Sequence, residues 1–576
     1  MISYTISCEN PAGQYLQIEM AIPEIEGDKL QLQMPAWRPG RYELGNFAKN
    51  VQAWRAEDID GKFLPFEKRT KDLWEVTCKD IDTVVVKYNL YASELNAGST
   101  YVDAEQLYLN PVNCLMYVPQ RAGEDCSLSL NVPEDYLVAG SLRQTSGHQL
   151  WAPDFDRLAD SPIIASATLQ HQDFDLGGVQ FHLWFQGIAR PEWSRIQKDF
   201  MAFTGEQLKV FGAFPVEEYQ YLFQVPPYPV YHGVEHERST VIALGPGFEL
   251  MKPEKYGEFL GISSHELFHT WNVKALRPAE MYPYDFTKEN YSPLGYVAEG
   301  VTTYYGDYML LRSGVWSFNE YCYKAGKVLN RHFHNYGRFN LSVAASSFDT
   351  WLDGYSEGAP NRKVSIYHKG ALVALILDVR LRKRSNHKLS LDTVMRQLYE
   401  KFALQKIGFT EADYKGTIEA ISDEDYTDFF QNYIWGTDAL DEVLDEAFDF
   451  LGLAIKRVPS AFMAEQRLGF KLNEEMMVTA IAPGSPAEVA GLSLKDEVLS
   501  LNGIPLQEKY VLSLFAFFEK AKMKLTVRSR GNLRTLKLQG GSETYYPYHE
   551  VVKQEHPTAE QMRNFEAWAG HRWEAE

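Results

Sequence analysis

Hydrophobic and polar residues alternate in short runs over the first 168 residues of the chain. Residues 15–20 and 84–90 are two such runs, and turn-forming residues separate them from their neighbours. A period of two residues places alternate side chains on opposite faces of a strand, so that one face can pack in a core. We therefore expect residues 1–168 to form an all-β, sandwich-like domain.

One stretch of this domain, residues 34–42, interrupts the strand pattern with two prolines and a glycine. Proline fixes one backbone angle and glycine permits tight turns, so this stretch is expected to be a rigid loop. In the structural interpretation of the loop, its Trp37 packs in the core.

Residues 169–452 begin with further strands. Residues 181–185 and 219–225 have strand patterns, and the amphipathic stretch 191–211 between them is expected to be a helix that begins at a proline. We interpret this part as the β subregion of a larger domain.

The rest of that domain has a mainly helical pattern, from about residue 253 onward. Ser292 and Pro293 are the residue types that favour a helix N-cap and first turn. The strongly apolar stretch 366–377 predicts another helix. Residues 169–452 are therefore expected to form one mainly α-helical domain that contains the β subregion.

The pattern returns to short β runs over residues 453–540. Several glycines and the pair Asn502-Gly503 are typical of tight turns between strands. We expect a small β domain here, followed by a tail over residues 541–576 with a helix at residues 557–570. The whole chain is thus predicted to be a multidomain α+β protein.

Composition and charge restrict the partners of the chain. Of its 576 residues, 45% are hydrophobic and 23% are charged, a balance that is ordinary for soluble globular proteins. The formal net charge is -20, whereas phosphate-rich partners require clustered lysine and arginine. No apolar run reaches transmembrane length. We therefore expect no nucleic-acid partner and no membrane partner.

The cysteines and the N-terminus bear on the cellular compartment. The cysteines, five in number, include no C-x-x-C pair, which argues against a disulfide framework and against a cysteine zinc site. The first residues have a strand pattern rather than a basic segment followed by an apolar run, so no signal peptide is expected. A cytoplasmic location is predicted, with a periplasmic one as the alternative if a leader has been removed.

The strongest chemical signal is the motif His265-Glu266-Leu267-Phe268-His269. Two histidines four residues apart lie on one face of a helix, where both imidazoles can bind one metal ion. Glu266 is then placed to act as general base on a water at that ion, as in the H-E-x-x-H motif of zinc hydrolases. The alternative is a surface helix on which this spacing arises by chance.

Catalytic zinc needs a third protein ligand, and Glu299 is the best candidate. It follows His269 by 30 residues, enough for a loop and the start of a second helix, and its neighbours are mostly uncharged. Antiparallel packing of the two helices would bring Glu299 over the histidines. In the alternative interpretation, Glu299 is a first-turn glutamate that the helix dipole favours.

Five stretches together resemble the glycyl aminopeptidase family, which consists of zinc metallopeptidases with a PDZ domain. The similarity extends over nearly the whole chain. The resembling stretches are residues 34–42 in the N-terminal domain, 233–236 in a substrate-binding strand, 265–274 in the zinc helix, 299–305 in the third-ligand helix and 367–370, a tyrosine motif shared with alanyl aminopeptidases.

This resemblance implies a thermolysin-like catalytic domain with one Zn²⁺ ion bound by His265, His269 and Glu299. It also implies that Tyr367 donates a hydrogen bond to the oxyanion of the tetrahedral intermediate, a role that sequence alone would not assign to one tyrosine among 34. Gly233 and Glu235 would bind substrate, with the Glu235 carboxylate holding the free α-ammonium group.

One position departs from the family pattern, since His232 stands where the family usually has glycine just before the substrate-binding strand motif. This residue can reshape the pocket for the first side chain of the substrate. The preferred N-terminal residue, glycine, alanine or another, is therefore left open.

Residues 453–540 resemble a PDZ domain, in which Leu468, Gly469 and Phe470 would form the carboxylate-binding loop. PDZ domains capture a peptide C-terminus by strand addition. A peptide C-terminus is thus one expected partner, and the alternative is a structural domain whose groove is already occupied.

The leading prediction is a zinc aminopeptidase that removes the first residue of peptides with a free N-terminus. A zinc endopeptidase with the same chemistry is the nearest alternative. A PDZ adaptor on an inactive protease scaffold is the third. The sequence leaves the physiological substrate, the oligomeric state and the native divalent metal open.

Overall fold

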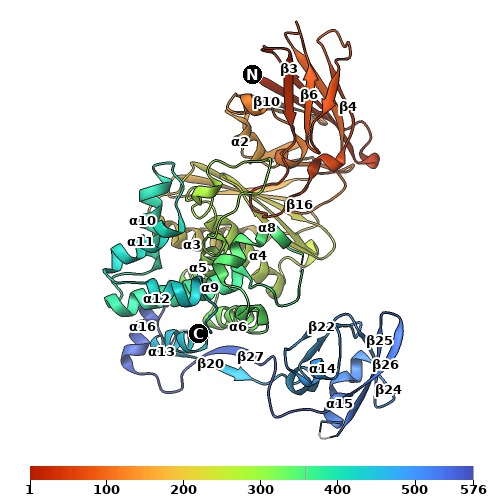
Figure 1. Ribbon diagram of the computed structural model, residues 1–576. Helices are drawn as coiled ribbons and strands as arrows, with labels where there is room; N and C mark the ends of the chain where they lie inside the picture. Colours follow the sequence, from red (N-terminus) through yellow and green to blue (C-terminus); the bar gives the residue numbers. More distant parts are fainter. Residues whose placement is uncertain (357, 520, 575–576) are drawn as a thin grey trace. The chain divides into compact units, whose positions relative to one another are not determined.

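The structure is a computed structural model that describes residues 1–356, 358–519 and 521–574 (Figure 1). The predicted succession of an all-β domain, a mainly helical domain with a β subregion and a small C-terminal β domain is confirmed. The chain divides into two compact units, and each is described by itself. The first comprises residues 1–315, 347–357 and 389–426, and the second comprises residues 316–346, 358–388 and 427–576.

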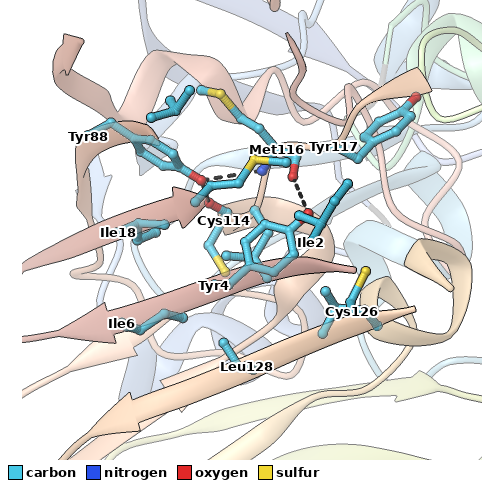
Figure 2. Close-up of a cluster of buried hydrophobic side chains, with 14 of the residues drawn as sticks. Ile2, Tyr4, Ile6, Ile18, Tyr88, Cys114, Met116, Tyr117, Cys126 and Leu128 are labelled. Atoms are coloured by element: carbon cyan, nitrogen blue, oxygen red, sulfur yellow. Dashed lines mark hydrogen bonds between the residues drawn. The ribbon is translucent and has the colours of Figure 1, made fainter. Parts of the chain in front are cut away.

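The N-terminal β domain has a core built on the predicted alternation of side chains. Every second residue of its first strand is buried. Figure 2 shows this core, where the hydroxyl of Tyr4 donates a hydrogen bond to the carbonyl oxygen of Met116 at 2.8 Å. Tyr88 donates in the same way to the carbonyl oxygen of Cys114, also at 2.8 Å. The two phenols therefore keep their polar ends satisfied inside an apolar cluster.

Three sheets make up this domain. The largest has the strand order β12-β13-β10-β1-β2-β7-β4, and its bounds in that order are Arg143–Ser146, Gln149–Ala152, Cys126–Asn131, Ile2–Ser7, Tyr15–Ile22, Val84–Tyr91 and Val51–Glu57. The second, β3-β6-β5, comprises Lys29–Gln33, Leu73–Thr77 and Phe66–Lys68. The third, β11-β14-β9-β8, comprises Leu137–Gly140, Ile163–Ser166, Gln106–Leu109 and Tyr101–Val102, and the short helix α2 spans Phe155–Ala159.

The β subregion of the first unit is a five-stranded sheet with the order β15-β16-β17-β19-β18. Its three inner strands run parallel, and the two edge strands pair antiparallel to them. The amphipathic stretch predicted as a helix forms α3 (Trp193–Phe211), directly after strand β16. The bounds are Gln170–Leu176 for β15, Val179–Gly187 for β16, Glu218–Val225 for β17, Val230–Glu235 for β18 and Ser239–Gly245 for β19.

The two helices that follow this sheet carry the metal motif and its third candidate ligand. Helix α4 (Pro253–Phe268) begins at a proline, which fits the first turn of a helix. The second helical segment consists of a π-helix, η6 (Tyr296–Val301), that continues into α5 (Thr302–Arg312). Its regular part begins at Tyr296, later than Ser292 and Pro293 predicted, although the Ser292 hydroxyl accepts a hydrogen bond from the amide of Leu294 as an N-cap serine does. The remaining helices of this unit include α8 (Thr350–Asp353), α10 (Leu391–Leu398) and α11 (Glu411–Ser422).

The second unit contains helices and the small β domain. Strand β27, from the segment predicted as a tail, pairs antiparallel with β20 and contacts α6. The predicted terminal helix is present as α16. The bounds are Phe318–Phe333 for α6, Ile366–Ser385 for α9, Asp441–Phe450 for α13, Leu453–Val458 for β20, Tyr548–Lys553 for β27 and Ala559–Ala569 for α16.

The small β domain has a core of its own, formed by buried residues between Met463 and Leu538. Its strands are β21 to β26, with the bounds Phe470–Leu472, Val478–Ile481, Glu497–Leu501, Ile504–Pro505, Met523–Ser529 and Asn532–Leu538, and its helices are α14 (Pro486–Val489) and α15 (Val511–Phe517). Among the described helices of the whole chain, none combines the length and the apolar character needed to cross a bilayer.

Candidate active site

The two histidines of the motif face each other at the end of α4. His265 lies in the last turn of the helix, and His269 is its C-cap residue. Their Nε2 atoms are 3.1 Å apart, and their ring planes are nearly perpendicular, at 85°. The prediction that the four-residue spacing places both imidazoles on one face is therefore confirmed.

Asn272 fixes the orientation of the second histidine. The Nδ1 atom of His269 lies 2.9 Å from the carbonyl oxygen of Asn272, so Nδ1 carries the proton and Nε2 is left as the ligand atom. The side-chain amide of Asn272 donates to the carbonyl oxygen of Val297 at 2.8 Å and to the hydroxyl of Thr302 at 2.9 Å. Asn272 thus ties the loop after α4 to the segment that carries Glu299.

Glu299 completes a set of three donors. It lies in the π-helix η6, a distortion that is frequent at functional sites, and its exposed fraction is 2%. Its Oε2 atom is 3.3 Å from Nε2 of His269 and 3.7 Å from Nε2 of His265. Burial alone would raise the pKa of Glu299, but the two imidazoles lower it. Glu299 is therefore an ionised carboxylate that faces both histidines.

The spacing of these three atoms fits a tetrahedral metal ion. Ligands about 2.0–2.1 Å from zinc at tetrahedral angles stand about 3.3–3.4 Å from one another. The observed separations of 3.1, 3.3 and 3.7 Å lie around this value. Two imidazoles and one carboxylate are also a ligand set that catalytic zinc uses, with a fourth position open.

Glu266 lies beside this donor set and is buried, with an exposed fraction of 5%. Its Oε2 atom has no hydrogen-bond partner among the described residues, and an orphaned buried carboxylate oxygen is costly. Burial raises the pKa of Glu266 well above its usual range. A carboxyl group in this environment holds a proton more tightly than an exposed one, which suits a group that takes up a proton and later returns it.

Gly233 in strand β18 makes this arrangement possible. A Cβ atom at position 233 would lie 2.1 Å from Oε1 of Glu266, so only glycine leaves room for that carboxylate. Gly233 was predicted as a substrate-binding residue, and the structure gives it a steric reason to be glycine. Its contact with substrate stays a prediction.

Glu235 is the last residue of the edge strand β18, and it is buried rather than exposed as edge positions often are. Ligand atoms of Glu235, Glu266 and His269 all lie within 4.8 Å of one another. Among the residues that the structure describes, Glu235 forms no ion pair, although its exposed fraction is only 4%. A cation supplied from outside would satisfy it.

The loop at residues 34–42 closes over the same site, and this contact was not predicted. Gly40 lies against Glu235, and a Cβ atom there would be 2.5 Å from Oε2 of that carboxylate. The hydroxyl of Tyr42 donates a hydrogen bond to Oε1 of Glu299 at 3.2 Å. Trp37 has no exposed surface, as the structural interpretation of the loop expects. The sequence predicted a rigid loop here, but no local pattern indicated that the loop contacts Glu235 and Glu299.

His232, the position that departs from the family pattern, is half-buried next to another residue of this loop. Its Nε2 atom lies 3.5 Å from Nη2 of Arg38. Burial is the main cause that lowers the pKa of His232, to about 3, so its imidazole is neutral at physiological pH. The neutral imidazole of His232 therefore lies beside the buried guanidinium of Arg38, which in turn interacts electrostatically with Glu235.

Tyr367 is the second residue of α9 and is half-buried. It belongs to the second compact unit, whereas the histidines and Glu299 belong to the first. Its role as oxyanion donor therefore stays a prediction.

The predicted carboxylate-binding loop of the small β domain joins a π-helix that ends at Leu468 to strand β21, which begins at Phe470. Leu468 and Phe470 have no exposed surface and belong to the domain core. Gly469 between them has a positive φ of 75°, and a Cβ atom there would lie 2.4 Å from Cβ of Ser485. Glycine is therefore required by the backbone at this turn. Peptide binding by the loop stays a prediction.

Comparison with protein families assigns three parts of the chain. Residues 3–167 match the Peptidase M61 N-terminal domain, and residues 258–373 match the family described as M61 glycyl aminopeptidase. Residues 458–528 match the PDZ domain. The predicted resemblance to glycyl aminopeptidases with a PDZ domain is confirmed. The search of curated proteins finds no match.

Two peptidases are among the solved structures to which the chain was matched. A crystal structure described as an aminopeptidase N family protein from Idiomarina loihiensis is 26% identical, with a TM-score of 0.91, over 99% of this chain and 100% of that chain. The M1 zinc metallopeptidase from Deinococcus radiodurans is 13% identical, with a TM-score of 0.44, over 73% of this chain and 89% of that chain.

Proposed function

Because this chain carries the N-terminal, catalytic and PDZ domains of M61 glycyl aminopeptidases, we propose that it is a zinc-dependent aminopeptidase. It removes single residues from the free N-terminus of peptides. The observation that carries the proposal is the meeting of His265, His269 and Glu299, whose three donor atoms are spaced as ligands of one tetrahedral ion.

The chemistry divides between the ion and Glu266. When bound, zinc supplies a water of lowered pKa and polarises the substrate carbonyl. The Glu266 carboxylate takes a proton from the attacking water and later delivers it to the leaving amine. Its high proton affinity, caused by burial, favours both steps because the carboxyl group can hold the proton between them.

Glu235 restricts the reaction to the first peptide bond. Its buried carboxylate, which forms no ion pair with the described residues, binds the α-ammonium group of the substrate. An internal peptide segment has no such cation and would leave the carboxylate unpaired in a site that excludes water. This discrimination makes the enzyme an exopeptidase rather than an endopeptidase.

The remaining predicted roles complete the proposal. Tyr367 donates a hydrogen bond to the developing oxyanion, as its motif in the family implies. The loop of Leu468, Gly469 and Phe470 binds a peptide C-terminus at the edge of β21. This second peptide site can recruit substrates or partners without taking part in the chemistry.

A panel of fluorogenic aminoacyl amides, with matched N-acetylated forms, tests this function on protein of measured metal content. We expect about one zinc per chain, cleavage of free-amine substrates and no cleavage of the acetylated forms. Removal of zinc by a chelator should abolish activity, and added zinc should restore it. Equal cleavage of internal bonds in blocked peptides would instead identify an endopeptidase, and a metal-free inactive protein would contradict the proposal.

A further inference from the structure

We infer that Tyr42, from the N-terminal β domain, is a positioning residue for the metal ligand Glu299. The inference rests on the proposed function, because it assigns Glu299 to a metal ion. The Tyr42 hydroxyl donates to Oε1 of Glu299 at 3.2 Å, whereas Oε2 of the same carboxylate faces the two imidazoles. The phenol thus occupies one carboxylate oxygen and leaves the other for the ion.

A carboxylate can bind a metal ion through one oxygen or through both. The hydrogen bond from Tyr42 makes Oε1 a poorer ligand and fixes the plane of the carboxylate, so that Oε2 alone is presented. Groups that orient ligands in this way typically affect metal affinity strongly, although they never contact the ion. Both side chains are buried, with exposed fractions of 2% for Glu299 and 4% for Tyr42, so bulk solvent has little access to this contact.

The ring of Tyr42 is itself held in place. It packs edge-to-face against Trp351 of α8, with ring centroids 6.1 Å apart. Trp37, from the same loop, packs against Trp351 at 5.1 Å and donates through Nε1 to the carbonyl oxygen of Asp285 at 2.7 Å. The loop is therefore anchored at Trp37 and at the Tyr42 ring itself, which holds the Tyr42 hydroxyl in position against Glu299.

The same loop contacts the other end of the site, where Gly40 lies against the Glu235 carboxylate. Residues 34–42 consequently touch both the proposed ammonium site and the proposed metal ligand. The N-terminal domain is therefore part of the active site, with Tyr42 acting on the ligand and Gly40 forming a wall at Glu235.

The variant Tyr42→Phe tests the inference, because it removes the hydroxyl and keeps the ring. We expect its zinc affinity, measured on metal-free protein by competition with a chromophoric chelator, to fall on the order of 10- to 100-fold. The melting temperature of the metal-free protein should change no more than in Tyr4→Phe. That control loses a buried hydrogen bond of similar kind, to the carbonyl oxygen of Met116, away from the site, and should bind zinc like the unaltered protein.

A double-mutant cycle separates orientation of Glu299 from general packing. In a Glu299→Ala background, Tyr42→Phe should produce no further loss of zinc affinity, because the group through which it acts is gone. Equal zinc affinity of Tyr42→Phe and the unaltered protein would overturn the inference alone. The inference would also be overturned if Tyr42→Phe lowered zinc affinity by the same factor with and without Glu299. A larger loss of thermal stability in Tyr42→Phe than in Tyr4→Phe would overturn it as well. Failure of the unaltered protein to bind zinc would overturn the proposed function and this inference together.

Discussion

At the scale of single residues, buried charge marks the site. Glu235, Glu266 and Glu299 have exposed fractions of 4%, 5% and 2%, and their carboxylates gather around the two imidazoles. A buried carboxylate is costly unless a cation or hydrogen-bond donors compensate it. Of these three carboxylates, only Glu299 has both: the imidazoles lie opposite one of its oxygens, and the Tyr42 hydroxyl donates a hydrogen bond to the other. Cations favour such a site, and the proposed reaction supplies two of them, a metal ion and a substrate ammonium group, in addition to the buried Arg38 guanidinium.

Glu266→Gln should separate catalysis from metal binding. The amide keeps the shape of the side chain but cannot take a proton, so kcat should fall by at least about 10²- to 10⁴-fold. The zinc content should stay unchanged, because Glu266 is not among the three ligands. Glu254→Gln, at an exposed position in the first turn of the same helix, is the matched control and should retain full activity. Substantial activity of Glu266→Gln would contradict the assignment of the general base.

Glu235→Ala should weaken recognition of the free amine. In the unaltered enzyme, a peptide inhibitor with a free N-terminus should bind at least about tenfold more tightly than its N-acetylated form, as expected for loss of one charged hydrogen-bonding partner. The variant should lose this preference, because its site no longer contains the anion. Glu237→Ala, two residues further on and paired with Arg238, should keep the preference. Equal losses for both inhibitors in Glu235→Ala would exclude the anchoring role.

At the scale of elements, the sequence predicted the features that depend on local pattern and missed those that depend on contacts between distant segments. The positions of His265 and His269 follow from helical spacing, so the sequence was sufficient to place them together. The π-helix that carries Glu299 could not be predicted, since it depends on contacts such as those of Asn272 with its carbonyl and hydroxyl groups. The Tyr42 contact joins residues 257 positions apart, and no local pattern encodes such a pairing.

Close packing of α4 and α5 depends on Gly306. A Cβ atom at this position would lie 3.1 Å from Cα of His265, and the Gly306 carbonyl oxygen accepts a hydrogen bond from the Ser264 hydroxyl at 2.7 Å. We expect Gly306→Ala to destabilise the protein by about 1–3 kcal/mol, as overpacking does. Zinc affinity should fall as well, because the helix backbone beneath a ligand must move.

A second glycine in a helix provides the control for this substitution. Gly205 lies inside α3, where an added Cβ would meet no atom within 4 Å. Gly205→Ala should therefore stabilise the protein by up to about 1 kcal/mol through helix propensity. Urea denaturation of both variants makes the comparison. Similar effects at the two positions would show that steric contact with α4 is not the cause.

At the scale of the whole molecule, a buried ion network joins the N-terminal β domain to the sheet and helices of the site. Lys274, in the loop after α4, pairs with Asp160 at 2.9 Å, and His236, next to Glu235, contacts the same oxygen at 3.0 Å. The order of domains was visible in the sequence, because each has its own pattern. Their junction was not, since it depends on charges that meet only after folding.

Asp160→Asn should destabilise the protein by about 3–5 kcal/mol at pH 7, because it leaves the Lys274 ammonium buried without its counter-ion. Burial alone would raise the pKa of Asp160, but Lys274 and His236 hold it well below its usual range. Stability from this pair is therefore complete above the unfolded-state pKa of about 3.9 and declines as the pH falls below it. Urea denaturation between pH 7 and pH 3 should show the free energy of unfolding fall with pH. In Asp160→Asn, the part of this fall that is due to protonation of Asp160 should be absent.

The central claim is that His265, His269 and Glu299 hold one metal ion, and anomalous X-ray diffraction at the zinc edge tests it most directly. For zinc-loaded crystals, the account predicts a single peak per chain. It should lie about 2.0–2.2 Å from Nε2 of both histidines and from Oε2 of Glu299. A peak elsewhere, or none between these three side chains, would contradict the account.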